Sequence, residues 1–220
     1  MSATSEPLIV RRYAPRDRAA VRHLCCDTAT RGAPVEQFFD DREVFADFVT
    51  RYYTDYEPNA LWVAEHTGRV IGYLSGCLDP CRYRWLSRSV VVPFATVKAI
   101  WRGALWSRKT WRLLNAGVRT WMHRQGRWRI RLDEYPAHLH LNIKETYRGQ
   151  GVGSQLVARF IDQARAIELP GIHAAVRADN DASCRFFERM GFTEVFRCQV
   201  IFPEGLITRL HETILYGKQL

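Results

Sequence analysis

Apolar residues follow two different periods along the chain, and their order predicts the arrangement of strands and helices. Short alternating or continuously apolar runs predict strands at residues 8–13, 61–65, 70–78, 137–143, 172–176, 192–201 and 206–216. Helical spacing predicts helices at about residues 15–25, 35–53, 152–167 and 180–190. This order predicts a mixed α/β (α+β) fold, with strands and helices alternating after residue 137.

A basic segment at residues 82–131 interrupts this order before the strand at residues 137–143. Two sets of apolar positions predict two amphipathic helices, one with Val97, Ile100, Trp101, Ala104 and Leu105, the other with Trp111, Leu114, Val118, Trp121 and Met122. The segment holds eleven arginines, two lysines and six of the seven tryptophans, but no acidic residue. The other residues carry 19 of the 32 basic and all 23 acidic side chains, so the net charge of +9 originates here.

Length and composition favour an ordinary intracellular domain. The 220 residues fit one domain, 1–220, with residues 82–131 as a helical insert. No run of eighteen apolar residues occurs, and the start MSATSEPLIVRRY lacks the apolar region of a signal peptide, so we expect a cytoplasmic protein. The six cysteines form no paired C-x-x-C units; we expect them to be reduced and mostly buried, and we expect no metal site.

A glycine-rich turn, RGQGVG at residues 148–153, joins the strand at residues 137–143 to the helix that follows. Glycines at the start of a helix expose backbone N–H groups at the positive end of the helix dipole, where an anion such as phosphate is favoured. A P-loop would need Lys-Ser or Lys-Thr after the last glycine, and the dinucleotide fingerprint needs G-x-G-x-x-G. Neither pattern is present, so the turn predicts another phosphate-containing ligand.

A second motif lies some thirty residues further on, NDASCRFFERMGF at residues 180–192. The two motifs, in this order and spacing, resemble the GNAT superfamily of acetyl-CoA-dependent N-acetyltransferases, whose second motif commonly reads N-x-x-A-x-x-F-Y-x-x-x-G-F. Residues 53–79 and 135–141 are also similar to a bacterial GNAT group and, more distantly, to the acetyltransferase-like domain of protein O-GlcNAcase. The resemblance implies a GNAT-like acyl-CoA N-acyltransferase fold, with the helical insert before the central strand.

The resemblance also implies how acetyl-CoA (coenzyme A) would bind. The pantetheine would lie along the backbone of Leu141, Asn142 and Ile143. Backbone N–H groups of the turn would hold the pyrophosphate, with Arg148 adding charge: Arg148, Gly149, Gln150, Gly151, Val152, Gly153 and Ser154. The side chain of Asn180 would bond the pantetheine, and Ser183, Phe186 and Phe187 would flank it.

Phe187 departs from the family pattern. The family usually has tyrosine at this position, and the phenol protonates the departing thiolate, which phenylalanine cannot do. Another group or water then acts as the acid, or transfer proceeds without one, because a thiol with a pKa near about 8.5 is a fair leaving group. A third interpretation is a domain that binds acetyl-CoA but catalyses poorly.

The base that deprotonates an amine acceptor is expected on or just before the strand at residues 137–143. An amine with a pKa near about 10.4 is protonated at neutral pH, so a proton must be removed before attack. Strand alternation places His138, His140 and Asn142 on one polar face, and Glu134 lies just upstream. The ordinary interpretation of the two histidines is packing within the core. Tyr52 and Tyr53 are candidates to line the acceptor pocket, with helix packing the favoured interpretation for at least one of them.

Two functions remain open from the sequence. The first is direct acetyl transfer from acetyl-CoA to a primary amine, in a small molecule or a protein, within a ternary complex. The second is a catalytically weak acyl-CoA-binding module whose basic insert engages a partner or an anionic membrane.

The insert itself has three interpretations. Its helices pack on the sheet edge or on a second subunit of a homodimer, form a lid over the acceptor site, or bind anionic lipid or nucleic acid. No nucleic-acid-binding signature is present, so we do not expect a nucleic-acid partner.

Overall fold

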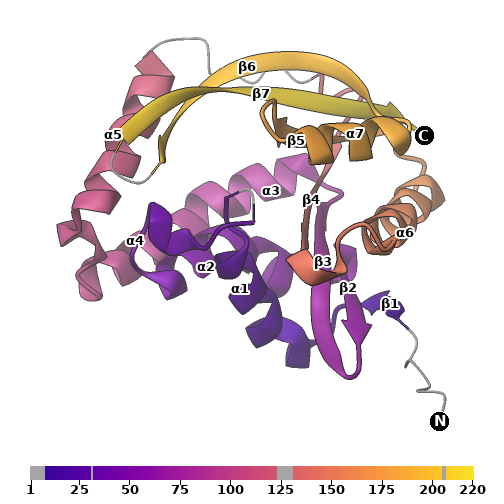
Figure 1. Ribbon diagram of the computed structural model, residues 1–220, viewed down its shortest axis with the longest axis horizontal. Helices are drawn as coiled ribbons and strands as arrows, with labels where there is room; N and C mark the ends of the chain where they lie inside the picture. Colours follow the sequence, from indigo (N-terminus) through magenta and orange to yellow (C-terminus); the bar gives the residue numbers. More distant parts are fainter. Residues whose placement is uncertain (1–7, 31, 123–130, 205–206) are drawn as a thin grey trace.

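The strands of the computed structural model form one seven-stranded mixed sheet in the order β1-β2-β3-β4-β5-β7-β6 (Figure 1). The structure describes residues 8–30, 32–122, 131–204 and 207–220, so residues 123–130 of the predicted insert lie outside the described part. The strands are β1 Ile9–Arg12, β2 Leu61–His66, β3 Arg69–Cys77, β4 Ala137–Ile143, β5 Gly171–Arg177, β6 Thr193–Glu204 and β7 Ile207–Gln219. Each coincides with a predicted strand, and the α/β class is confirmed.

Helices cover both faces of this sheet. They are α1 Arg18–Asp27, α2 Arg42–Arg51, α3 Pro80–Leu86, α4 Val92–Trp101, α5 Arg108–Met122, α6 Val152–Ala166 and α7 Asp181–Arg189. Helix α6 lies on one side of β2 and β3, and α1 and α2 lie on the other (Figure 1). The long β6–β7 hairpin extends toward α5 (Figure 1). Helices α3–α5 therefore form the helical insert that precedes the central strand β4.

The core beneath α6 is closely packed. Leu156, Val157 and Phe160 are fully buried, since positions three and four apart in a helix share one face. The ring of Phe160 lies where a Cβ on Gly76 of β3 would be, with only 2.1 Å between them. Glycine at position 76 is therefore what allows α6 to approach β3 so closely.

The Gly76→Ala variant is expected to lose about 1–3 kcal/mol of unfolding free energy, because overpacking forces the Phe160 ring or the strand to shift. Urea denaturation measures this loss. Gly117→Ala is the matched control: Gly117 lies inside α5 and an added Cβ would meet open space. That variant should be as stable as the native chain or slightly more stable. Equal stability of the two variants would contradict this account of the α6–β3 contact.

Ion pairs attach the insert to α1 and α2. Asp47 of α2 is buried and bonds both Arg22 of α1 and Lys98 of α4, each over 2.5 Å. These bonds hold the pKa of Asp47 below its usual value, although burial alone would raise it. Arg102 pairs with Asp41 over 2.6 Å. The inner side of α4 is thus fixed to the domain by charge as well as by packing.

The single helix predicted over residues 35–53 is wrong. The structure has a 3₁₀ turn at Val35–Gln37, a break, and then α2 from Arg42. The side chain of Asp41 accepts a hydrogen bond from the Val44 amide and begins α2 as its N-cap. Aspartate favours such caps over helix interiors because its carboxylate competes for backbone N–H groups.

The two apolar faces predicted in the insert do not pack on the sheet edge. Val97, Ile100 and Trp101 of α4 are exposed, and so are all five predicted residues of the α5 face; Ala104 alone of the first set is buried.

Helix α3 begins at Pro80, directly after its N-cap residue Asp79. Within the described residues no helix is both long and apolar enough to cross a membrane.

Candidate active site between β4 and β5

Strands β4 and β5 pair for only two residues and then separate. They run parallel with Ala137 opposite Ile172 and His138 opposite His173, and no further pair follows. On its other side β4 stays paired with β3 as far as Ile143. The backbone of residues 139–143 therefore presents an edge without a strand partner toward β5, with N–H and C=O groups able to bond an extended ligand.

The N-terminus of α6 lies beside this open edge. Gly151 is the N-cap residue with φ of 78°, and no side chain caps the first turn. Gly149 also has a positive φ, 76°, and a Cβ at either glycine would meet open space. A Cβ at Gly153 would come within 3.2 Å of Ile143 and Phe186, so glycine there allows the helix start to lie against β4 and α7. Exposed N–H groups at such a helix end are able to bind an anion.

A cavity of about 900 Å³ connects the open edge of β4 with the N-terminus of α6. Most of the residues predicted to bind acetyl-CoA line it: Leu141, Asn142, Ile143, Arg148, Gly149, Gly151, Gly153, Ser154, Asn180, Ser183, Phe186 and Phe187. His140 lines it as well. Its size suits a mid-sized organic ligand.

Four predicted site residues do not line the cavity. Gln150 donates a hydrogen bond from Nε2 to the carbonyl of Thr146, over 2.9 Å, and Val152 is buried in the core. Glu134 pairs with Arg131 over 2.7 Å, and the ring centre of His138 lies 5.6 Å from that of His140. Of the base candidates on β4 and before it, His140 is the one with access to a ligand in this cavity.

Arg148 closes one end of the cavity. Its Nε donates to the carbonyl of Ile143 over 3.1 Å, which holds the side chain across the end of β4. The guanidinium lies over Gly32, where a Cβ would come within 2.6 Å of it. The side chain is exposed beside the start of α6, so its guanidinium can contribute to binding a phosphate group.

The polar face of β4 packs against aromatic side chains. The hydroxyl of Tyr53 lies 2.9 Å from Nε2 of His138, and the ring of Tyr83 lies 4.7 Å from the same imidazole. Asn142 donates from Nδ2 to the hydroxyl of Tyr73 over 2.8 Å. The predicted alternation of β4 is confirmed, because Leu139 on the opposite face belongs to the core beneath α6.

Both histidines of β4 are neutral at physiological pH. Desolvation, followed by the neighbouring His173, lowers the pKa of His140 to about 4, although its side chain opens to the cavity. The pKa of His138 is also lowered well below its usual value by burial, by His140 and by His173. A neutral imidazole can accept a proton, but one with so low a pKa is a weak base.

Helix α7 forms the wall opposite β4. The side chain of Asn180 caps this helix by accepting from the Ser183 amide over 3.2 Å. Phe187 is buried and stacks on Tyr216 at 6.1 Å between ring centres. The Tyr216 hydroxyl donates to Glu188 over 3.0 Å and does not line the cavity, so it does not replace the missing phenol.

Several lining residues were not predicted from the sequence. The loop after α1 contributes Thr28 and Thr30, and the β5 end and β7 contribute Arg177 and His211. Arg177 lies 2.9 Å from Nδ1 of His211. Neither motif includes these four residues: Thr28, Thr30 and His211 lie far along the chain from both, and Arg177 comes just before the second. Only the folded chain shows that they reach the cavity.

Part of the chain matches a known protein family, and the whole fold resembles solved structures. Residues 116–192 match the model of the acetyltransferase (GNAT) family. The structure of SsHAT is 23% identical with a TM-score of 0.71, over 96% of this chain and 98% of that one. The ribosomal-protein-alanine N-acetyltransferase of Brucella melitensis is 18% identical with a TM-score of 0.57, covering 96% and 99%.

A third structure contains a ligand. The putative acetyltransferase yncA of Salmonella typhimurium, determined with its cofactor acetyl-CoA, is 16% identical with a TM-score of 0.56, over 97% of this chain and 94% of that one. These likenesses show that the fold is that of the GNAT acyl-CoA N-acyltransferases, as predicted.

Proposed function

Because the chain carries a GNAT acetyltransferase domain, we propose that it transfers an acetyl group from acetyl-CoA to a primary amine, directly and within a ternary complex. The observation that carries the proposal is the early end of β4–β5 pairing beside the uncapped, glycine-rich start of α6. This arrangement combines a peptide-like edge for an amide-containing chain with donors for phosphate groups. Coenzyme A matches both: its pantetheine is an amide-containing chain, and it is joined to a pyrophosphate.

Residues of β4 and of the start of α6 would hold the coenzyme. The free N–H groups of the first turn of α6, aided by Arg148, would bind the pyrophosphate, and the open edge of residues 141–143 would pair with the pantetheine amides. Acetyl-CoA would supply the acetyl group as a thioester. A backbone N–H of the open β4 edge, close to His140, would then stabilise the oxyanion that forms when the amine attacks.

His140 would accept the proton of the acceptor amine, directly or through water. It is the one β4 histidine that lines the cavity, and its lowered pKa keeps it neutral at neutral pH. His138, fixed by Tyr53 behind it, would position His140 and exclude water from that side. Phe187 gives the thiolate no proton, so departure would rely on solvent or on the thiolate's own stability.

One alternative also has an observation in its favour. The cavity wall has no phenol at position 187, and a histidine with a pKa of about 4 is a weak base. Both features suit a module that binds an acyl-CoA but turns over slowly. The acceptor would in either case be a small-molecule or protein amine.

Amine-dependent release of CoA thiol should distinguish the two. Purified protein with acetyl-CoA is offered a small aliphatic amine, an amino sugar, an aminoglycoside and a lysine peptide in turn, and free thiol is measured with a colorimetric reagent. We expect at least one acceptor to raise the release well above the rate without amine. Calorimetric binding of acetyl-CoA with no release for any acceptor would favour the binding module.

A further inference from the structure

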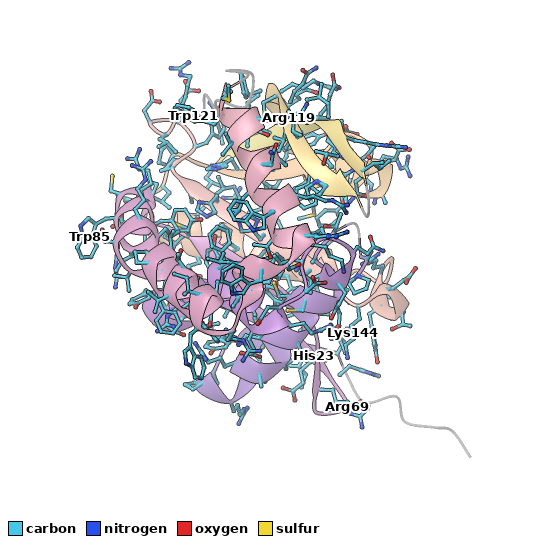
Figure 2. All side chains as sticks on the ribbon, turned by 90° about the vertical axis from the view of Figure 1, so that its left-hand side faces the viewer. His23, Arg69, Trp85, Arg119, Trp121 and Lys144 are labelled. Atoms are coloured by element: carbon cyan, nitrogen blue, oxygen red, sulfur yellow. The ribbon has the colours of Figure 1, made fainter. Side chains whose placement is uncertain are left out.

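The outer side of helices α3–α5 carries an unusual concentration of exposed tryptophan. Trp101, Trp106 and Trp121 are 84%, 86% and 75% exposed, and Trp85 and Trp111 are also exposed. Figure 2 looks onto this side, with Trp85 projecting from α3 and Trp121 from the upper part of α5. We call this surface the tryptophan face. Exposed aliphatic side chains lie among the tryptophans: Val97, Ile100, Leu114, Val118 and Met122.

A row of arginines runs beside the apolar residues of α5. Trp111, Leu114 and Val118 follow one another at intervals of three and four residues and so share one side of the helix. Arg108, Arg112 and Arg119, at intervals of four and seven residues, share a second side. The third side, with Thr110 and Ala116, is buried against the domain. We call the three arginines the arginine row.

The charges of the arginine row are not compensated. Within the described residues none of the three forms an ion pair, whereas Lys98, Arg102 and Lys109 nearby do. Lys109 pairs with Asp40 over 2.6 Å. Lys98 pairs with Asp47 of α2, and Arg102 pairs with Asp41, the N-cap of α2. The inner cations thus hold the insert in place, and the outer ones are available to a partner.

We propose that the tryptophan face and the arginine row together dock on a bilayer that contains anionic phospholipid. A helix with a basic side next to a side of Trp and aliphatic residues lies in the plane of the headgroup region, with its apolar side chains reaching the acyl boundary. Tryptophan favours that boundary because its ring is apolar and its N–H is polar. The absence of any acidic residue in 82–131 removes repulsion from the lipid phosphates.

Two other occupants fit less well. A symmetric contact with a second copy would bring two sets of unpaired arginines together, and like charges repel. Single-stranded nucleic acid would use the tryptophans and arginines, but bases stack on rings and give aliphatic residues such as Val118 and Leu114 no role. Lipid uses all three kinds of side chain.

Vesicle co-sedimentation of the full chain tests the proposal. We expect the protein to sediment with vesicles of phosphatidylcholine and phosphatidylglycerol in equal parts, and to stay in the supernatant with phosphatidylcholine alone. The triple variant R108E/R112E/R119E should bind more than about tenfold more weakly. W101Q/W106Q/W121Q should lose binding to a similar degree, because it removes the groups that insert.

A matched control reverses three exposed arginines elsewhere, R69E/R159E/R165E, from the β2–β3 turn and α6. It should bind like the native chain, and all three variants should keep acetyl-CoA affinity, because none of the changed residues lines the cavity. The proposal is overturned if native protein ignores anionic vesicles or if the control loses as much binding as R108E/R112E/R119E. If the native protein is a dimer and the tryptophan variant is not, the face is a dimer interface instead. If the protein binds RNA and L114S/V118S leaves that binding unchanged, the face is an RNA-binding surface instead.

Discussion

Acetyl-CoA affinity is expected to fall about a thousandfold in the double variant R148E/G151D, because at least two charge-assisted contacts to the pyrophosphate would be lost or reversed. The aspartate would place a carboxylate at the N-terminus of α6, where it would occupy the free N–H groups and repel phosphate. The glutamate would replace the guanidinium at the end of the cavity with a second negative charge. Isothermal titration calorimetry measures the change.

The β2–β3 turn provides a matched control. Gly68 has φ of 72° and open space around its Cβ position, as Gly151 has, and Arg69 follows it directly. G68D/R69E therefore makes the same two kinds of change, with the same backbone strain, on a surface away from the cavity. It should bind acetyl-CoA like the native chain. Unchanged affinity in R148E/G151D would rule out the α6 N-terminus as the phosphate site.

The second large effect is expected from His140→Gln. Loss of a general base typically costs about a hundredfold or more in turnover, and we expect about a hundredfold here because the base is weak. Acetyl-CoA affinity should change little, since the backbone of β4 and not this imidazole would hold the coenzyme. His23→Gln, an exposed histidine on α1, is the control and should keep full activity. Full turnover in His140→Gln would mean that another group or water removes the proton.

The pH profile gives an independent measure of the same residue. The base must be unprotonated, and desolvation lowers the pKa of His140 to about 4, below the ordinary histidine value. Protonation of His140 should therefore add no further loss of activity as pH falls through 6 and 5, and should steepen the fall only near pH 4. From there to neutral pH, kcat/KM should rise as the acceptor amine deprotonates. An inflection near about 6.5 that disappears in His140→Gln would contradict a desolvated His140.

The elements around the candidate site could be predicted because local sequence determines them. Gly149 and Gly151 take positive φ values that favour glycine, and Asn180 caps α7 through its own side chain. The polar alternation of β4 likewise follows from a period of two. These features need no knowledge of distant residues, and the structure places them around one cavity.

Other features depend on contacts that sequence patterns do not contain. The separation of β4 from β5 after His138 depends on how the sheet assembles. The same is true of the finding that His140 lines the cavity and His138 does not. The apolar periodicity of α5 predicted an amphipathic helix but left open where its apolar face lies; the helix buries Thr110 and Ala116 and exposes Trp111 and Trp121. Periodicity shows that a helix has two kinds of surface, without showing which one faces the protein.

A crystal structure of the chain with CoA bound tests the central claim most directly. We predict the pyrophosphate on the backbone N–H groups of the first turn of α6, next to Arg148, and the pantetheine along residues 141–143 in the gap between β4 and β5. The thiol should then lie between His140 and Phe187. CoA bound elsewhere on the molecule, with this gap unfilled, would contradict the assignment of the site.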